Sequence, residues 1–297
     1  MDLASDLKKG KKNIDEFFDT AKRVLSYMPN VISESKRKDH YVIHKSTSAG
    51  STKFLRPINE KLFISDPSEF EEKYKSFMQS VALLKKNRTE NDFSKSSLEE
   101  IDSVLYTIQQ SLGCGMDLLI NANSARKHIG NRLEELMKCI FTEIGITNKK
   151  VVLKIPYEQE GKTKTYKCEN DLILSPYKKI RSSSTNIDEN EIVVSVKTSS
   201  KDRMGKIFID KMLLTKFVGH SVKVIGIFLN DVQRKKSNNV SFTLVSGTFM
   251  VYTNFLTELE GVYYLDSPPQ AEKEPHSRHL HQFSELLTKH VWQLLAS

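Results

Sequence analysis

Residues 193–210 read VVSVKTSSKDRMGKIFID, and they join an apolar strand to a charged helix start. Val194 and Val196 alternate with Ser195 and Lys197. Because successive side chains of a strand point to opposite faces, this period of two buries the valines and brings Ser195 and Lys197 together on the other face. The pattern predicts a lysine that is presented at the end of a core strand.

The residues after this strand are typical of a helix start. Ser199 can cap the helix, and Asp202, three residues later, completes a capping-box pattern. Lys201, Asp202 and Arg203 would then occupy the first turn. Arg203 and Asp210 are seven residues apart, which predicts one shared helix face and a separation of roughly 10 Å along the axis.

The triplet Lys201, Asp202 and Arg203 has two interpretations. In the major groove, guanine offers acceptors that suit Lys or Arg, and cytosine offers an N4 donor that suits a carboxylate. The triplet is therefore complementary to consecutive G·C pairs. The alternative is a solvated, capped helix turn with no ligand, which short charged motifs often are.

The overall charge agrees with a nucleic-acid partner. The chain has 297 residues with 45 Lys plus Arg against 37 Asp plus Glu, a net charge of +8. A positive excess favours polyanions through counterion release. The length and the 38% hydrophobic content predict a core large enough for the chain to fold without covalent cross-links.

Cysteine usage and the N-terminus predict a soluble protein of a reducing cytoplasm. Cys114, Cys139 and Cys168 are far apart and form no CxxC pair, so the sequence indicates neither a zinc knuckle nor a disulfide framework. The N-terminus lacks the apolar core of a signal peptide, and the apolar run 224–229 is too short to span a membrane.

The chain divides into a predicted helical N-terminal region, residues 1–95, and a predicted core domain, residues 96–297. A helical stripe over 14–25 stops at Pro29. A basic, polar segment then runs over 33–56, predicted to be a loop that either clamps phosphates or is merely solvated. Its cations are Lys36, Arg37, Lys38, Lys45, Lys53 and Arg56.

Periodicity in the rest of the chain predicts a mixed α/β fold. Helices are expected over 70–84, over 98–112 with an end near Gly113 and Gly115, over 125–144, over 253–259 and over 280–294. Strands are expected over 151–157 and 164–174 as a hairpin, then over 192–197, 220–229, 240–249 and 261–265.

Two other motifs do not indicate a binding site. Gly161-Lys162-Thr163 resembles the end of a P-loop, but Pro156 occupies the place of the first glycine, so the segment is interpreted as a hairpin turn. His276, His279 and His281 have no complementary cysteine or carboxylate motif and are interpreted as a solvated helix start.

Four residues form a candidate catalytic constellation. Glu134 flanks the apolar stripe of a helix, Asp171 lies on a strand with its side chain opposite the core, and Lys197 ends the neighbouring strand. Hard carboxylate oxygens hold Mg²⁺, and a lysine can orient a nucleophile and offset developing charge. Asp210 can supply a further metal ligand. Taken alone, Glu134 would be a surface carboxylate.

Three short motifs carry a family resemblance: NDLIL at 170–174, SVKTS at 195–199 and KDR at 201–203, with 130–134 upstream. Together they resemble the PD-(D/E)XK type II restriction endonucleases, and within them the branch that cuts CCGG, CCNGG or CCWGG sites, which includes SsoII, EcoRII and NgoMIV. The resemblance covers residues 125–265 and, more weakly, the chain before them. It implies a mixed β-sheet flanked by helices as the catalytic and dimerisation core, residues 96–297, preceded by a helical N-terminal region with a basic DNA-contacting loop. It also implies a bacterial or archaeal cytoplasm.

The resemblance also implies residue roles. In this branch the acid two places before the lysine is replaced, here by Ser195, and a carboxylate of the following helix takes over, at the position of Asp210. Asp171, Lys197, Glu134 and Asp210 become the implied catalytic residues, with Asp171, Asp210 and Glu134 as metal ligands.

Other implied features concern DNA recognition. Lys201, Asp202 and Arg203 match the basic-acidic-basic triplet that reads GG/CC. Asn170 stands where the motif has proline, and Asp210 is one methylene shorter than the usual glutamate. Some members flip a nucleotide with N-terminal residues, and Arg56 is a candidate for stacking on such a base.

The expected function is that of a Mg²⁺-dependent type II restriction endonuclease that cuts both strands of a short palindrome containing GG/CC and leaves a 5′-phosphate. Symmetric reading of double-stranded DNA calls for a homodimer, or a tetramer of paired dimers, and the host needs a DNA methyltransferase to protect its own sites. Two alternatives stay open: a sequence-specific DNA-binding protein with a decayed nuclease centre, and a structure-selective repair nuclease.

Overall fold

The computed structural model describes residues 1–48, 51–235 and 239–297. The larger helices in these residues are α1 (Leu3–Lys8), α2 (Ile14–Tyr27), α3 (Pro67–Asn87), α4 (Lys95–Leu119), α5 (Ala122–Glu143), α6 (Met204–Val218), α7 (Ser246–Phe255) and α9 (Val291–Ala296). None of the helices within the described ranges is long and apolar enough to cross a membrane.

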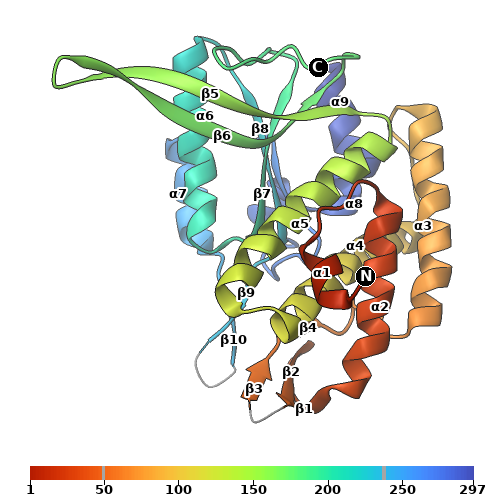
Figure 1. The fold of residues 1–297 in the computed structure, drawn as a ribbon. Helices are drawn as coiled ribbons and strands as arrows, with labels where there is room; N and C mark the ends of the chain where they lie inside the picture. Colours follow the sequence, from red (N-terminus) through yellow and green to blue (C-terminus); the bar gives the residue numbers. More distant parts are fainter. Residues whose placement is uncertain (49–50, 236–238) are drawn as a thin grey trace.

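A mixed sheet of six strands, counted within the described residues, organises the fold (Figure 1). Its strands are β5 (Thr147–Gln159), β6 (Lys162–Ser175), β7 (Ile192–Ser199), β8 (Lys223–Asn230), β11 (Gly261–Tyr264) and β12 (Leu280–Gln282). They lie in the order β12-β11-β8-β7-β6-β5. β5, β6 and β7 pair antiparallel, whereas β7, β8, β11 and β12 pair parallel. The prediction of a mixed sheet flanked by helices is therefore confirmed.

β7 lies between two hydrophobic cores, as its alternating sequence requires. Val194 and Val196 pack in the core shared with α4 and α5, whereas Val193 packs in the core shared with α6 and α7. In Figure 1, α6 and α7 lie on the left of the sheet, and the N-terminal helices lie on the right. Because side chains alternate along a strand, Ser195 and Lys197 share the α6 side with Val193.

The core on the α5 side continues into the N-terminal region without interruption. Phe17 and Phe77 belong to the same buried cluster as Leu105 and Leu136, and all four are almost fully buried. Burial of such large side chains stabilises the fold by about 1.5–3 kcal/mol each. The helices over 14–25, 70–84 and 125–144 are thus present as predicted, and they are joined by one apolar interior.

The basic segment 33–56 is not the predicted loop. It forms β1 (Ile32–Lys38), β2 (Tyr41–Ser48) and β3 (Ser51–Phe54), which pair antiparallel. β1 exposes almost every side chain, so its sequence shows no apolar alternation, and only its pairing with β2 makes it a strand. β4 (Ile58–Asn59) also pairs with β2. Ala49 and Gly50 of the predicted loop lie outside the described residues.

α4 does not end near Gly113 and Gly115 as predicted; it continues to Leu119. Gly113 does not end the helix; a glycine is needed there because the site is closely packed. A Cβ built there would lie 2.5 Å from Nε of Arg56, whose side chain packs against this turn. The glycine therefore serves a contact between α4 and the chain after β3.

Three predictions near the C-terminus are also wrong. The expected strand over 240–249 is a short strand, β10 (Val240–Phe242), paired with β9 (Val232–Arg234) and followed by α7. α7 replaces the helix predicted over 253–259, because Phe249 packs on Phe208 of α6. The helix predicted over 280–294 begins only after β12, with a helical turn at Phe283–Glu285 (α8), a π-helical turn over 286–290 and α9.

The packing of Arg56 on Gly113 gives a stability prediction. Gly113→Ala should lower the free energy of unfolding by about 1–3 kcal/mol, because the added methyl group overpacks a buried site. The matched control is Gly130→Ala on α5, where a Cβ would meet nothing within 4 Å. There the substitution should raise the free energy of unfolding by about 0.5–1 kcal/mol. Urea unfolding measures both, and an unchanged midpoint for Gly113→Ala would contradict the packing argument.

Candidate active site

Two predicted residues, Asp171 and Lys197, lie in direct contact on neighbouring strands. β6 and β7 pair with Leu172 opposite Val194, which brings Asp171 beside the end of β7. The Lys197 ammonium donates a hydrogen bond to Oδ2 of Asp171 and forms an ion pair with it. The backbone N–H of Val196 donates to the same oxygen at 2.8 Å. The carboxylate is therefore fixed by two donors of the adjacent strand.

This pair lines a cleft of about 450 Å³ between the sheet and α6. Ser195 lines it from β7, and Arg203 and Asp210 line it from the α6 side, as the spacing of seven residues predicted. The side chains of Lys197 and Asp171 are only 20% and 12% exposed. Charges in such a partly dehydrated cleft interact more strongly than they would in bulk water.

Asp210 lies in this cleft but is paired with a residue that the sequence analysis missed. Nζ of Lys206 donates to Oδ1 of Asp210 at 2.7 Å. Burial lowers the pKa of Lys206, but its hydrogen bond to Asp210 and the Asp210 charge outweigh burial and raise that pKa. The i, i+4 spacing of oppositely charged residues in a predicted helix was the signal that could have revealed Lys206.

Glu134 approaches the pair from another direction. It lies on α5, which packs on the opposite side of the sheet from α6. Burial and the Asp171 charge raise the pKa of Glu134, whereas Lys150 and Lys197 lower it. Glu134 is therefore within electrostatic reach of both Asp171 and Lys197.

The three predicted metal ligands do not form one cluster. Within the described ranges, no group of three His, Cys, Asp or Glu side chains is placed to hold a metal ion. The donor chemistry nevertheless fits a hard divalent cation, because the carboxylates of Asp171 and Asp210 line the same cleft. Asp171 and Asp210 are the residues that would hold such an ion, with Glu134 acting on Asp171 through its charge.

The predicted reading triplet follows β7 as a short 3₁₀ turn, Lys201–Arg203, ahead of α6. Lys201 and Arg203 are exposed, and Arg203 also lines the cleft. The side chain of Asp202 lies outside what the structure describes. The predicted cap is wrong, because Ser199 still belongs to β7 and the turn has no side-chain cap.

Tertiary contacts hold this turn in place of a cap. The hydroxyl of Ser200 shares a hydrogen bond of 2.7 Å with that of Tyr264 on β11. The backbone N–H of Lys201 donates to Oγ1 of Thr243 at 3.0 Å. These two hydrogen bonds hold the turn against the rest of the protein, and Lys201 and Arg203 are exposed to solvent.

The structure gives Arg56 a structural contact that differs from the predicted stacking. Its Nε and Nη2 donate to the two carboxylate oxygens of Asp117 at 3.0 and 3.1 Å. Burial lowers the pKa of Arg56, but the Asp117 charge and hydrogen bonds raise it by more. This bidentate pair joins the chain after β3 to α4.

Several cations of the 33–56 segment also have partners within the protein. Lys45 pairs with Glu34, and Arg37 pairs with Glu60. Lys38 donates to the carbonyl of Val240 at 3.2 Å. Contact of this segment with DNA therefore stays a prediction.

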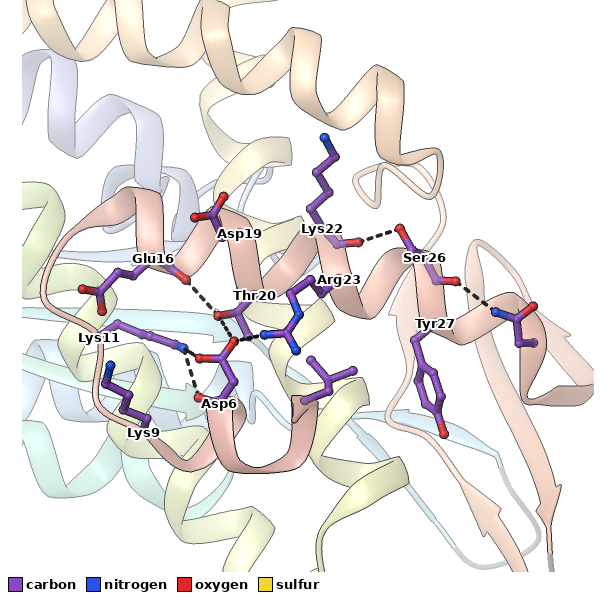
Figure 2. A pocket seen from close by; sticks show the side chains of 12 residues that line it. Asp6, Lys9, Lys11, Glu16, Asp19, Thr20, Lys22, Arg23, Ser26 and Tyr27 are labelled. Atoms are coloured by element: carbon purple, nitrogen blue, oxygen red, sulfur yellow. Dashed lines mark hydrogen bonds and ion pairs between the residues drawn. The ribbon is translucent and has the colours of Figure 1, made fainter. Parts of the chain in front are cut away.

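A second hollow, of about 960 Å³, lies between α1 and α2 and contains none of the predicted site residues (Figure 2). Asp6 accepts hydrogen bonds from Nζ of Lys11 and Nη1 of Arg23, both at 2.6 Å, and from Oγ1 of Thr20 at 3.1 Å. These contacts neutralise Asp6 and fix α1 to α2, which is a structural role.

The fold of this chain is also found among solved structures of known proteins. No protein-family model matches the chain, and the search of curated proteins found no match. Among solved structures, the chain is similar to the Type IIP restriction endonuclease Kpn2I, with a TM-score of 0.70 and 17% sequence identity over 95% of this chain and 91% of that chain. The fold is that of a type II restriction endonuclease.

A further similarity, to the restriction endonuclease PspGI in a complex with substrate DNA, has a TM-score of 0.43 and 12% identity over 76% of this chain and 93% of that chain. The likeness to Kpn2I confirms the predicted fold class.

The charge interaction between Asp171 and Glu134 can be tested directly. Asp171→Asn should lower the pKa of Glu134, because it removes a negative charge that raises it. The matched control is Asp210→Asn, which removes a carboxylate already paired with Lys206 and should change the pKa of Glu134 much less. Carbon-13 NMR titration of the glutamate carboxyl groups measures both, and equal shifts in the two variants would refute the assignment.

Proposed function

We propose that the chain is a type II restriction endonuclease that cuts both strands of a short palindromic DNA site containing GG/CC, of the CCNGG kind, in a Mg²⁺-dependent reaction that leaves a 5′-phosphate. The observation that carries the proposal is the contact of Asp171 with Lys197 in a cleft that also contains Arg203 and Asp210. The same cleft thus contains the carboxylates and the lysine proposed to act on the phosphodiester, together with Arg203, a cation suited to contact guanine.

The chemistry follows from the charges of the cleft. A divalent cation held by Asp171 and Asp210 would supply Lewis-acid polarisation of the scissile phosphate. Lys197 is positioned by Asp171, and its ammonium offsets the negative charge that develops on the phosphate. Glu134 acts through its charge on Asp171 and Lys197. The four proposed catalytic residues are therefore Asp171, Lys197, Glu134 and Asp210.

Base reading is assigned to Lys201, Asp202 and Arg203. Lys201 and Arg203 point outward from a turn whose backbone is anchored by Thr243 and whose preceding Ser200 is anchored by Tyr264. A turn held by these two hydrogen bonds, with its cations exposed, suits bidentate contact with the O6 and N7 acceptors of guanine. The turn starts four residues after Lys197, so reading and cleavage would take place at the same part of the duplex.

The proposed biological setting follows from this activity. The substrate is double-stranded DNA, the assembly is a homodimer or a tetramer of dimers, and a cognate DNA methyltransferase protects the host sites in the cytoplasm. A palindrome presents two identical half-sites, which a twofold-symmetric assembly reads with two copies of the same turn.

Cleavage provides the main test. Purified protein incubated with plasmid and Mg²⁺ should give discrete fragments, and run-off sequencing of their ends should give one palindromic site. Sequence-specific binding without cleavage would instead favour a DNA-binding protein with a decayed nuclease centre. Cutting that follows junctions or ends, and not sequence, would favour a repair nuclease.

Lys197→Ala should reduce cleavage by roughly 10²–10³-fold or more, because it removes the cation that offsets charge on the phosphate. Binding measured in Ca²⁺ should be retained. Lys179→Ala, at an exposed lysine between β6 and β7, is the matched control and should leave cleavage intact. Full cleavage by the Lys197 variant would overturn the assignment of the active site.

Arg203→Ala should weaken discrimination of G·C pairs by about 1–3 kcal/mol, because the variant can no longer donate two hydrogen bonds to a guanine. The readout is the ratio of kcat/KM for the preferred site to that for a site with one G·C pair replaced. Lys216→Ala, an exposed cation near the end of the same helix, should keep the original ratio. A variant of Arg203 with unchanged discrimination would remove it from the reading role.

A further inference from the structure

The hairpin of β5 and β6 extends beyond the body of the protein. Figure 1 shows it passing α6 and ending at a turn that lies away from the helices. Its last buried pair is Leu153 with Cys168, and residues 154–167, which the structure describes in full, include no buried side chain. We call residues 154–167 the arm. A two-stranded hairpin that buries so little apolar surface contributes little to folding, so the length of the arm points to another role.

One face of the arm continues a wall of the catalytic cleft. Cys168 packs in the core shared with α6, and alternate side chains of a strand share a face, so Tyr166, Lys164 and Lys162 point to that side. Tyr166 itself lines the cleft that contains Asp171. A row of side chains therefore runs from the cleft towards the turn of the arm. We call this side of the arm the cleft-side face.

The cleft-side face has positive charges and no carboxylate. Side chains of both strands form it: Ile155, Tyr157, Gln159, Lys162, Lys164 and Tyr166. Nζ of Lys164 donates to Oε1 of Gln159 at 3.0 Å, a neutral partner that does not cancel the charge of the lysine. Glu158 points to the other face, where it accepts a hydrogen bond from Oγ1 of Thr163 at 2.6 Å, and Glu160 lies in the turn. The cleft-side face therefore attracts anions.

We propose that the cleft-side face binds the phosphate backbone of duplex DNA outside the recognition site. Lysine and tyrosine side chains both donate hydrogen bonds to phosphate oxygens, and Tyr157 and Tyr166 are 44% and 46% exposed. A duplex supplies one negative charge per strand about every 3.4 Å, which complements a face without carboxylates. A second copy of the chain would instead bring a net charge of +8. The inference rests on the proposed function, because it takes the cleft to hold the scissile phosphate.

The direction of the arm suits this contact. β6 runs antiparallel to β7, so the arm leaves the sheet past the carboxyl end of β7, which is where the reading turn follows. Lys164 and Lys162 precede Asp171 by seven and nine residues, which is at most about 23 and 30 Å of strand. The same lengths of duplex contain roughly seven and nine base pairs. The contacts therefore lie beyond a short palindrome and, because they involve phosphates, carry no sequence information.

Binding to duplexes of two lengths tests this contact. The full chain in Ca²⁺ is mixed with duplexes centred on the preferred site, found by run-off sequencing or by binding selection. Their flanks are about 4 or about 15 base pairs on each side, shorter and longer than the reach of the arm. The wild-type protein should bind the longer duplex more tightly, and Lys162→Ala/Lys164→Ala should lose most of that preference. On the longer duplex, the slope of log Kd against log salt should fall by about 2 per bound chain, because each lost phosphate contact contributes about 0.9.

Two further variants act as controls. Lys162→Arg/Lys164→Arg keeps the charge and should keep the preference for the longer duplex. Lys178→Ala/Lys179→Ala removes two exposed lysines just beyond the opposite end of β6, changes the net charge equally, and should also keep it. An equal loss in this last variant, or a Lys162→Ala/Lys164→Ala variant with the wild-type preference, would overturn the inference. So would a changed sedimentation mass of the Lys162→Ala/Lys164→Ala variant without DNA, because the arm would then contact a second copy.

Plasmid cleavage separates this inference from the proposed function. A wild-type protein whose preference for the longer duplex depends on Lys162 and Lys164, but which never cuts DNA, would refute the nuclease and leave the role of the arm in place. A protein that cuts one palindromic site but binds the two duplex lengths equally would refute the role of the arm and leave the nuclease in place. A protein that binds neither duplex would refute both.

Discussion

The contact between Asp171 and Lys197 depends on the register of β6 against β7. Leu172 faces Val194 across the strand pair, and this alignment alone places the carboxylate beside the lysine and the N–H of Val196. A slip of one residue would turn every side chain of the strand to the opposite face. The two hydrophobic cores on either side of β7 prevent such a slip, because each core buries every second residue of the strand.

This constraint explains why much of the fold could be predicted from the sequence. A strand that is buried on both faces must alternate its apolar and functional residues in a fixed way, and the valines of β7 do so. The same local logic identified the β5–β6 hairpin and the long helices, whose apolar stripes recur every three or four residues. It also placed Asp171 and Lys197 on the same side of the sheet, where the structure has them.

The remaining features depend on contacts between distant parts of the chain. β1 is a strand only because β2 pairs with it, and Gly113 lies inside a helix because Arg56 packs there. The sequence could not show that Glu134 approaches from the opposite face of the sheet. Lys206 was detectable from its spacing to Asp210, but only the folded structure shows that this pair lines the same cleft as Asp171 and Lys197.

The uninterrupted core beneath the N-terminal region has an evolutionary consequence. Phe17 and Phe77 share their interior with Leu136 of α5, and the Arg56–Asp117 pair joins the same parts of the chain. Exchange of residues 1–95 with the corresponding part of another protein would leave unmatched cavities and would remove the partner of the half-buried Asp117, each costly to stability. The region cannot be shuffled as an independent module, and its substitutions must be matched by compensating changes in α4 and α5.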